Sequence, residues 1–234
     1  MERTANPRVK ICCISSIEEA WIAIRCGASA LGLVSQMPSG PGVISEELIA
    51  KIAACVPPPI ATFLLTSSLD AQEIIQQVRC CRTNTVQICD YLESGSYQDI
   101  RDALPGISIV QVIHVITEKS IDEAINVAPY VDAILLDSGN QSLLIKELGG
   151  TGRLHDWNLS AKIREQVNVP IFLAGGLKPE NVAIAVKQVA PFGLDLCSAV
   201  RSNGKLDENK LKLFFQQLNR ALGRSEIKLP TPNS

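Results

Sequence analysis

Short apolar segments rich in β-branched residues alternate along the chain with segments whose apolar residues recur at helical spacing. This alternation predicts strands of a parallel sheet that are joined by amphipathic helices. The predicted strands cover residues 9–14, 30–35, 60–65, 85–89, 108–115, 132–137, 170–175 and 193–198. The predicted helices cover residues 16–27, 45–56, 69–80, 94–104, 120–128, 158–167, 179–190 and 207–218. Of these, residues 94–104 fit the helical pattern least well because they are mostly polar.

Eight strand–helix units in 234 residues favour a closed (β/α)8 barrel, the TIM barrel, over an open doubly wound sheet. No linker rich in Pro, Gly or Ser divides the chain, so we expect a single α/β domain over residues 1–223 and a C-terminal tail over 224–234. Ser16, Ser45 and Ser120 each precede an acidic turn, which predicts that they cap helices.

Composition limits the class of partner. A net charge of −2 and the lack of long Lys/Arg runs argue against binding to nucleic acid or to an anionic membrane. The N-terminus has no apolar segment, and no stretch approaches the roughly 20 apolar residues of a membrane span. We therefore expect a soluble cytoplasmic protein whose partner is a small molecule.

The cysteines and histidines suggest neither a disulfide framework nor a metal site. The chain has eight cysteines, which include two adjacent pairs, but no C-x-x-C spacing and only two distant histidines. Reduced and mostly buried thiols are the expected state, and no metal is expected.

Functional groups of a (β/α)8 barrel lie at the C-terminal ends of its strands and in the loops that follow. This rule selects Cys12 or Cys13 from the first strand and Asp137 at the end of the sixth. It also selects Gly175 and Gly176 after the seventh strand, and Ser198 with Arg201 after the eighth. Side chains of a strand alternate between its faces, so Lys10 and Cys12 share one face and Cys13 lies on the other. Which face meets a ligand depends on the fold.

Two glycine-rich turns follow the sixth and seventh strands, and they are typical of a phosphate site because bare backbone amides can approach an anion there. With the segment after the eighth strand they predict phosphate contacts from Gly149, Gly150, Thr151, Gly152, Gly175, Gly176, Ser198 and Ala199. The alternative is that these glycines only permit tight turns.

Asp137 and Cys12 have chemistry that suits an acid and a base. A carboxyl group that closes an apolar strand at a half-dry cavity is suited to donate a proton. A thiol in a partly positive site ionises easily, and Lys10 lies deeper on the same strand face. The alternatives are a loop anchor or helix cap for Asp137 and a plain barrel-lining thiol for Cys12.

The chain resembles the phosphoribosylanthranilate isomerase family, which are (β/α)8 enzymes of tryptophan biosynthesis. The resemblance rests on K-I-C (10–12), A-L-G (30–32), L-L-D-S (135–138), G-G-T-G (149–152) with D-W (156–157), L-A-G-G-L-x-P-E-N-V (173–182) and F-G-L-D-L-C-S-A-V (192–200). These motifs extend from the first strand to the eighth in the expected order, and those in the last third are the most specific.

The resemblance implies an Amadori rearrangement of an N-linked phosphoribosyl amine to an aminodeoxyribulose phosphate without a cofactor. It implies that Asp137 protonates the ring oxygen and that Cys12 takes the C2 proton. It also implies that Asp195 contacts the amino-aromatic end. Cys13 stands where the family usually has glycine, and it is expected to point outward to the helices. We expect a monomer or homodimer that binds a small phosphoribosyl substrate.

The chain departs from the family pattern around the aromatic end of the substrate. Gly42 falls where the family has an arginine for the anthranilate carboxylate, and Cys89 stands where an imidazole is usual. Arg201 is a candidate for a relocated carboxylate clamp, with a solvent-facing arginine as the alternative. His114 and Cys89 are candidate substrate contacts, with a core histidine as the alternative for His114, and His155 is a candidate cover for the phosphate.

These departures leave three hypotheses. The first is a phosphoribosylanthranilate isomerase with a rebuilt aromatic pocket, and the second is a sister isomerase for another phosphoribosyl amine. The third is a non-catalytic barrel that binds a sugar phosphate. A paired acid and base, Asp137 and Cys12, favours the two enzymes, since a binding protein needs neither.

Overall fold

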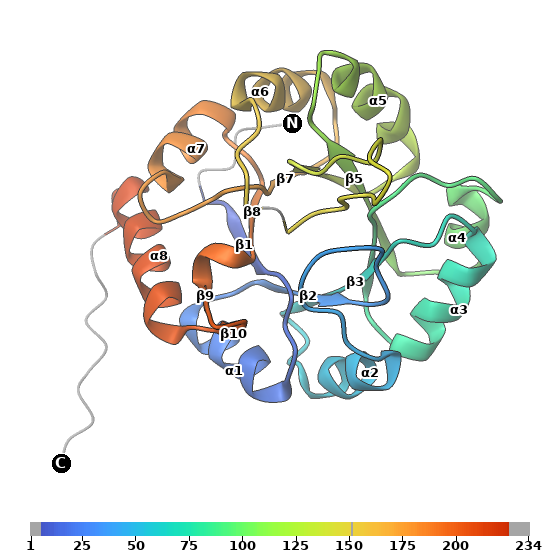
Figure 1. Ribbon diagram of the computed structural model, residues 1–234, viewed down its shortest axis with the longest axis horizontal. Helices are drawn as coiled ribbons and strands as arrows, with labels where there is room; N and C mark the ends of the chain where they lie inside the picture. The colour runs from blue at the N-terminus through green and yellow to red at the C-terminus, as the bar shows by residue number, and fades with distance from the viewer. Residues whose placement is uncertain (1–5, 151, 225–234) are drawn as a thin grey trace.

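The computed structural model describes residues 6–150 and 152–224 and contains a closed barrel of eight parallel strands inside a ring of helices (Figure 1). The strands are β1 (Arg8–Ile11), β2 (Ala30–Val34), β3 (Ala61–Thr66), β4 (Thr85–Ile88), β5 (Ser108–His114), β6 (Ala133–Asp137), β7 (Ile171–Leu173) and β8 (Gly193–Leu196). The barrel closes because β1 pairs with β8 as well as with β2. The predicted (β/α)8 barrel and all eight predicted strands are confirmed.

A helix follows each strand and covers the outside of the barrel. The helices are α1 (Ile17–Cys26), α2 (Glu46–Cys55), α3 (Ala71–Cys81), α4 (Tyr97–Ala103), α5 (Lys119–Val127), α6 (Trp157–Gln166), α7 (Val182–Val189) and α8 (Glu208–Ala221). Shorter elements are the 3-10 turns η1 (Ala128–Tyr130) and η2 (Ser198–Val200) and the hairpin of β9 (Arg201–Ser202) with β10 (Lys205–Leu206). None of the described helices has both the length and the apolar composition to cross a membrane.

The apolar residues of the strands form two layers. Side chains such as Phe63, Leu135 and Phe172 fill the barrel, whereas Leu31 and Leu64 pack between the strands and the helices. Both faces of each strand are therefore buried, which explains why the strands are continuous apolar runs rather than alternating ones. The inner layer supports the site because it fixes which side chains reach the open end of the barrel.

Local hydrogen bonds explain where the helices begin. Ser16 and Ser45 cap α1 and α2, as predicted, because each hydroxyl accepts a backbone N–H of the first turn. The predicted cap at Ser120 is wrong, since α5 begins at Lys119. The Ser120 hydroxyl lies inside the helix and donates instead to the carbonyl of His114 at 3.1 Å.

The fourth helix forms despite its polar sequence because it has a reciprocal cap. The Ser96 hydroxyl accepts the backbone N–H of Asp99, and the Asp99 carboxylate accepts the backbone N–H of Ser96. Such a capping box satisfies two donors that would otherwise lack partners at the helix start. α4 is accordingly short, and Ile100 is its fully buried residue.

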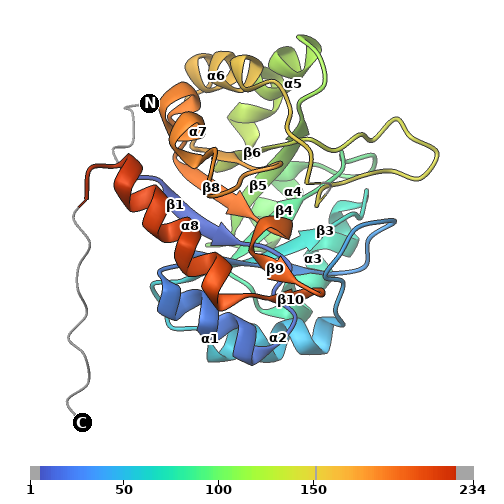
Figure 2. The same ribbon diagram turned by 60° about the vertical axis from the view of Figure 1, so that its left-hand side comes forward.

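Two long loops extend on the same side of the barrel, at the C-terminal ends of the strands (Figure 2). One follows β2 and is drawn in blue, and the other follows β6 and is drawn in yellow. A short antiparallel bridge between Asn140 and Glu147 shapes the second loop. Residues 225–234 of the predicted tail lie outside the described residues.

Candidate active site

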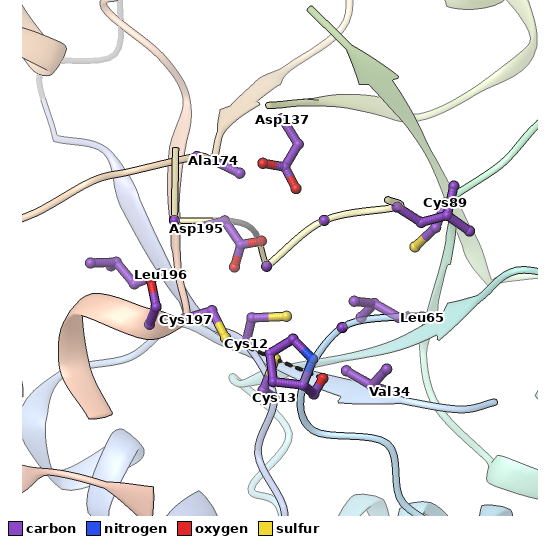
Figure 3. Close-up of a pocket in the computed structure, with 18 of the residues that line it drawn as sticks. Cys12, Cys13, Val34, Leu65, Cys89, Asp137, Ala174, Asp195, Leu196 and Cys197 are labelled. Atoms are coloured by element: carbon purple, nitrogen blue, oxygen red, sulfur yellow. Dashed lines mark hydrogen bonds between the residues drawn. The ribbon is translucent and has the colours of Figure 1, made fainter. Parts of the chain in front are cut away.

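A pocket opens at the C-terminal ends of the strands and brings together side chains from most of them (Figure 3). Its polar and sulfur-containing lining residues are Cys12, Cys13, Ser39, Gln87, Cys89, Asp137, Asp195, Cys197 and Ser198. Val34, Met37, Leu65 and Leu148 form an apolar wall. This is the end of the barrel at which (β/α)8 enzymes hold their reacting groups.

Cys12 and Asp137 face the pocket from opposite sides (Figure 3). Both residues are buried, with 7% of the surface of each exposed. The backbone N–H of Cys12 donates to the carbonyl of Leu196 at 2.7 Å, which holds the residue against β8. The backbone N–H of Ser138 donates to Asp137 Oδ1 at 2.7 Å and fixes that carboxyl at the strand end.

A buried ion pair lies next to the pocket, close to Cys12. Lys10 and Asp195 are register partners on β1 and β8, and Lys10 Nζ lies 2.9 Å from Asp195 Oδ2. Burial alone would lower the pKa of Lys10, but the Asp195 carboxylate and the Cys12 thiol outweigh it, so the pKa is raised. Lys10 therefore places a fixed positive charge close to Cys12.

Gly32 on β2 leaves room for these groups. A Cβ at Gly32 would lie 2.9 Å from Cys12 Sγ and 3.1 Å from Lys10 Nζ, which is closer than such atoms normally approach. The candidate residues chosen from the sequence did not include this glycine. Its position inside a strand was the available signal, because a strand glycine often marks a close approach.

The predicted phosphate residues gather at one side of the pocket. Gly149, Gly150, Gly152, Gly175, Gly176, Ser198 and Ala199 all line it, and Thr151 lies outside the described residues. A Cβ at Gly149 would lie 2.7 Å from Asp137 Oδ2, and one at Gly152 would lie 3.1 Å from Ser198 Oγ. The glycines thus bring bare backbone close to both Asp137 and Ser198.

The expectation that Cys13 points outward to the helices is wrong. β1 ends at Ile11, so the alternation of the strand no longer applies at Cys13, and its φ of 63° turns the chain. Its side chain lines the pocket, where Cys13 Sγ lies 2.9 Å from Cys197 Sγ and 3.5 Å from the carbonyl oxygen of Pro41 (Figure 3). Positive φ also explains why glycine is expected here from the resemblance.

Cys13 also explains why position 42 carries no side chain. A Cβ at Gly42 would lie 2.4 Å from Cys13 Cβ, and Gly42 itself has a φ of +83°. Any larger residue would have to displace the backbone of one of the two loops. Gly42, where the resemblance predicts an arginine, is therefore coupled to Cys13, where the resemblance predicts a glycine.

The structure corrects the prediction for Arg201. Its guanidinium does not line the pocket but pairs with the Glu19 carboxylate, at 3.1 Å between Nη1 and Oε1. It also donates to the carbonyls of Cys12 and Cys13. With only 9% of its side chain exposed, Arg201 ties the end of β1 to α1 rather than presenting a clamp to a ligand.

The two histidines also lie outside the pocket lining. His114 Nε2 lies 3.0 Å from the carbonyl oxygen of Cys89, and the ring packs under Gly139, so the core-histidine alternative fits and the predicted substrate contact does not. His155 Nε2 lies 2.7 Å from Ser160 Oγ in α6, and burial lowers the pKa of this imidazole.

Cys89 does line the pocket, at full burial, and burial together with the nearby Cys12 raises the pKa of its thiol. It therefore contributes a neutral thiol to the wall.

Two buried acceptors of the pocket have no hydrogen-bond partner within the described part of the chain. They are Gln87 Oε1 and Asp195 Oδ1. A buried polar atom without a partner costs free energy, so both atoms are suited to accept a hydrogen bond from a ligand. Gln87 was absent from the candidate residues, although a polar side chain in an apolar strand was a usable signal.

The fold and the pocket define a (β/α)8 barrel protein with buried polar groups gathered at the C-terminal ends of its strands. The chain matches, over residues 9–217, the family model described as N-(5'-phosphoribosyl)anthranilate (PRA) isomerase. A relative from Methanosarcina mazei named N-(5'-phosphoribosyl)anthranilate isomerase 2 is 37% identical over 212 residues, which cover 90% of this chain and 93% of that protein. The chain belongs to the N-(5'-phosphoribosyl)anthranilate isomerase family, and it is an isomerase.

Solved structures agree with this assignment. The crystal structure of phosphoribosyl anthranilate isomerase from Thermotoga maritima matches with a TM-score of 0.76 and 29% identity over 92% of this chain and 99% of that one. A phosphoribosyl anthranilate isomerase in complex with reduced 1-(o-carboxyphenylamino)-1-deoxyribulose 5-phosphate matches with a TM-score of 0.72 and 28% identity. That match covers 93% of this chain and 99% of the other.

Proposed function

We propose that this protein converts N-(5'-phosphoribosyl)anthranilate to the corresponding 1-amino-1-deoxyribulose 5-phosphate, a step of tryptophan biosynthesis. The observation that carries the proposal is the pairing of Asp137 and Cys12 across one pocket whose side wall is made of glycine loops. An Amadori rearrangement needs a proton donor on one side of the sugar and a proton acceptor on the other. Asp137 and Cys12 are suited to these two roles.

Asp137 acts first, as the general acid. It donates its proton to the furanose ring oxygen while the lone pair of the amine forms a C=N bond to C1, so the C1–O bond breaks and the ring opens to an imine. The Ser138 N–H at 2.7 Å holds the carboxyl in place for this transfer. The glycine loops beside Asp137 hold the phosphate, so the ring oxygen is positioned by the distant end of the substrate.

Cys12 acts second, as the general base. Its thiolate removes the proton from C2, and the electrons of that bond form a C1=C2 double bond. The π electrons of the C=N bond return to the protonated nitrogen, and an enolamine results. The charged ammonium of Lys10 lies close to this sulfur. The enolamine then tautomerises to the ketone. No redox cofactor is required, because substrate and product are isomers and the rearrangement has no net change in oxidation level.

The other end of the substrate fits the remaining part of the pocket. Val34, Met37, Leu65 and Leu148 offer an apolar surface for an aromatic ring. Asp195 Oδ1, which has no partner among the described residues, is suited to accept a hydrogen bond from the amine N–H of the substrate. Gln87 Oε1 is suited in the same way to accept one from a sugar hydroxyl. No Lys or Arg is among the described residues that line the pocket, so the anthranilate carboxylate gains no direct cationic partner there.

The test is a direct assay of the purified protein with phosphoribosylanthranilate, in which the fluorescence of the anthranilate group monitors the reaction. We expect turnover with a KM above that of an enzyme that holds the carboxylate with arginine, because a bidentate arginine contributes about 1.5–3 kcal/mol. Complementation of a tryptophan auxotroph lacking this isomerase gives the second arm. Absence of turnover together with tight binding of ribose 5-phosphate would favour a sister isomerase for another phosphoribosyl amine.

Gly32 provides a separate test of the base. We expect Gly32→Ala to lower kcat by about tenfold with little change in KM, because a displacement on the order of 1 Å of a reacting group can cost up to about 10²-fold. The new methyl group would push Cys12 Sγ away from its place next to Lys10. The measurements are steady-state kinetics and thermal unfolding, and an unchanged kcat would contradict the assigned position of Cys12.

A cytoplasmic location and a monomeric or homodimeric state stay predictions. A related structure from Thermotoga maritima is described as monomers of a dimeric phosphoribosylanthranilate isomerase. Light scattering of the purified protein distinguishes the two states.

A further inference from the structure

We propose that Cys13 and Cys197 form a reversible, oxidant-sensitive disulfide site at the edge of the active-site pocket. The two residues lie 184 positions apart in the sequence, and the fold brings their sulfur atoms to 2.9 Å. The proposal does not depend on the substrate assignment, because it concerns two thiols that the isomerisation does not use. Figure 3 shows both side chains below Asp195, next to Cys12 but distinct from it.

The backbone at Cys13 supports a specific role for its thiol. Cys13 is one of four non-glycine residues with positive φ within the described part of the chain, and such a conformation costs on the order of 1 kcal/mol for a side chain with a Cβ. Glycine would avoid this cost. A cysteine that is kept in a strained position and aimed at a second cysteine points to a use for the pair.

The surroundings make the two thiols chemically different. The hydrogen bond between Cys197 and Cys13 lowers the pKa of Cys197 against the opposing effect of burial, and the nearby guanidinium of Arg201 lowers it further. Hydrogen bonds with Cys12 and Cys197 raise the pKa of Cys13. Cys197 is therefore the nucleophile of the pair and Cys13 the resolving thiol.

Both thiols are reachable by a small oxidant. Cys13 and Cys197 line the pocket, and Cys197 is only partly buried. Arg201 gains a role in this arrangement, because it holds the carbonyls of Cys12 and Cys13 and pairs with Glu19, which fixes the end of β1 beside Cys197. The sulfur atoms need to move by less than about 1 Å to reach the bond length of a disulfide.

The oxidation is a two-step reaction with hydrogen peroxide. The Cys197 thiolate attacks one peroxide oxygen, the O–O bond breaks, and hydroxide leaves, which gives a sulfenic acid at Cys197. The Cys13 thiol then loses its proton and attacks the Cys197 sulfur, and the S–O bond breaks with release of water. In sum two thiols lose two electrons and two protons, and one peroxide becomes two waters.

Closing this bond ties the end of β1 to the start of η2, which carries Ser198. Cys12 precedes Cys13 directly, and Ser198 follows Cys197 directly. The base and one predicted phosphate contact therefore both shift when the disulfide forms. We expect kcat/KM to fall by about tenfold, since displacements on the order of 1 Å at reacting groups cost up to about 10²-fold, and to recover fully with a dithiol reductant.

Peptide mapping tests the site without relying on activity. The full chain is treated with one equivalent of hydrogen peroxide, free thiols are alkylated, and trypsin cleavage after Lys10, Arg25, Lys187 and Arg201 gives peptides 11–25 and 188–201. We expect these two peptides to be joined by a bond that a dithiol removes. Cys197 is the sole cysteine of the second peptide, so its partner is decided by variants of the first.

Three variants separate the alternatives. Cys13→Gly suits the positive φ and should abolish the link, whereas Cys12→Ala should retain it. Cys80→Ser removes an exposed thiol of α3 and should leave the link unchanged. The proposal is overturned if the link persists in Cys13→Gly, which would assign it to Cys12, or if both thiols remain alkylatable after Cys80 has been oxidised.

Discussion

Replacing Cys12 by alanine is expected to lower the turnover of phosphoribosylanthranilate by a factor between about 10² and 10⁴, the usual range for loss of a general base. The alanine removes the sulfur atom that we propose takes the C2 proton. It leaves intact the backbone hydrogen bond that the Cys12 N–H donates to the carbonyl of Leu196. KM should change little, because the thiol contributes mainly to the transition state rather than to substrate binding.

Cys12→Ser refines this experiment. Serine nearly conserves the volume of cysteine but is a far weaker base near neutral pH, so its activity should resemble that of the alanine variant. Cys26→Ala is the matched control, since Cys26 lies at the end of α1 in the outer layer of the barrel and should leave kcat unchanged. Retention of more than about one tenth of the turnover in Cys12→Ser would remove Cys12 from the base role.

The sequence predicted the fold well because each strand is buried on both faces and each helix on one. The apolar runs and the helical spacing therefore reflect which residues the barrel buries, and they predict the strand ends to within a few residues. Ser120 shows the limit of this reasoning. It has the composition of a cap, yet its hydroxyl is used by the carbonyl of His114 at the preceding strand end, which no local pattern reveals.

The site was predictable only as far as strand ends determine it. Cys12 and Asp137 both line the pocket because each closes or just follows a strand. The position of Arg201 could not be predicted in this way. Its guanidinium pairs with Glu19, which lies 182 residues away in the sequence, and therefore does not line the pocket. Cys13 was misplaced because alternation stops where the strand stops and a positive φ begins.

Cys13 and Gly42 belong together as one adaptation of the pocket. The Cys13 side chain occupies the space that a side chain at position 42 would need. The same cysteine reaches Cys197 and the carbonyl of Pro41, so the loops after β1, β2 and β8 meet at this residue. A side chain at position 42 would therefore displace Cys13, and with it one of the two thiols of the pair.

Asp137→Asn is expected to reduce turnover by a factor between about 10² and 10⁴, because it removes the proposed proton donor for ring opening. Asparagine keeps the shape of the side chain, and its Oδ1 can still accept the Ser138 N–H that now lies 2.7 Å from Asp137 Oδ1. The loss should therefore appear in kcat with the fold intact, which circular dichroism and thermal unfolding can verify. Asp132→Asn is the matched control, since this aspartate lies just before β6 at the opposite end of the barrel and is half-exposed beside Arg101. An Asp137→Asn protein with near-normal turnover would mean that the ring oxygen receives its proton from another group, and the acid role would have to be assigned elsewhere in the pocket.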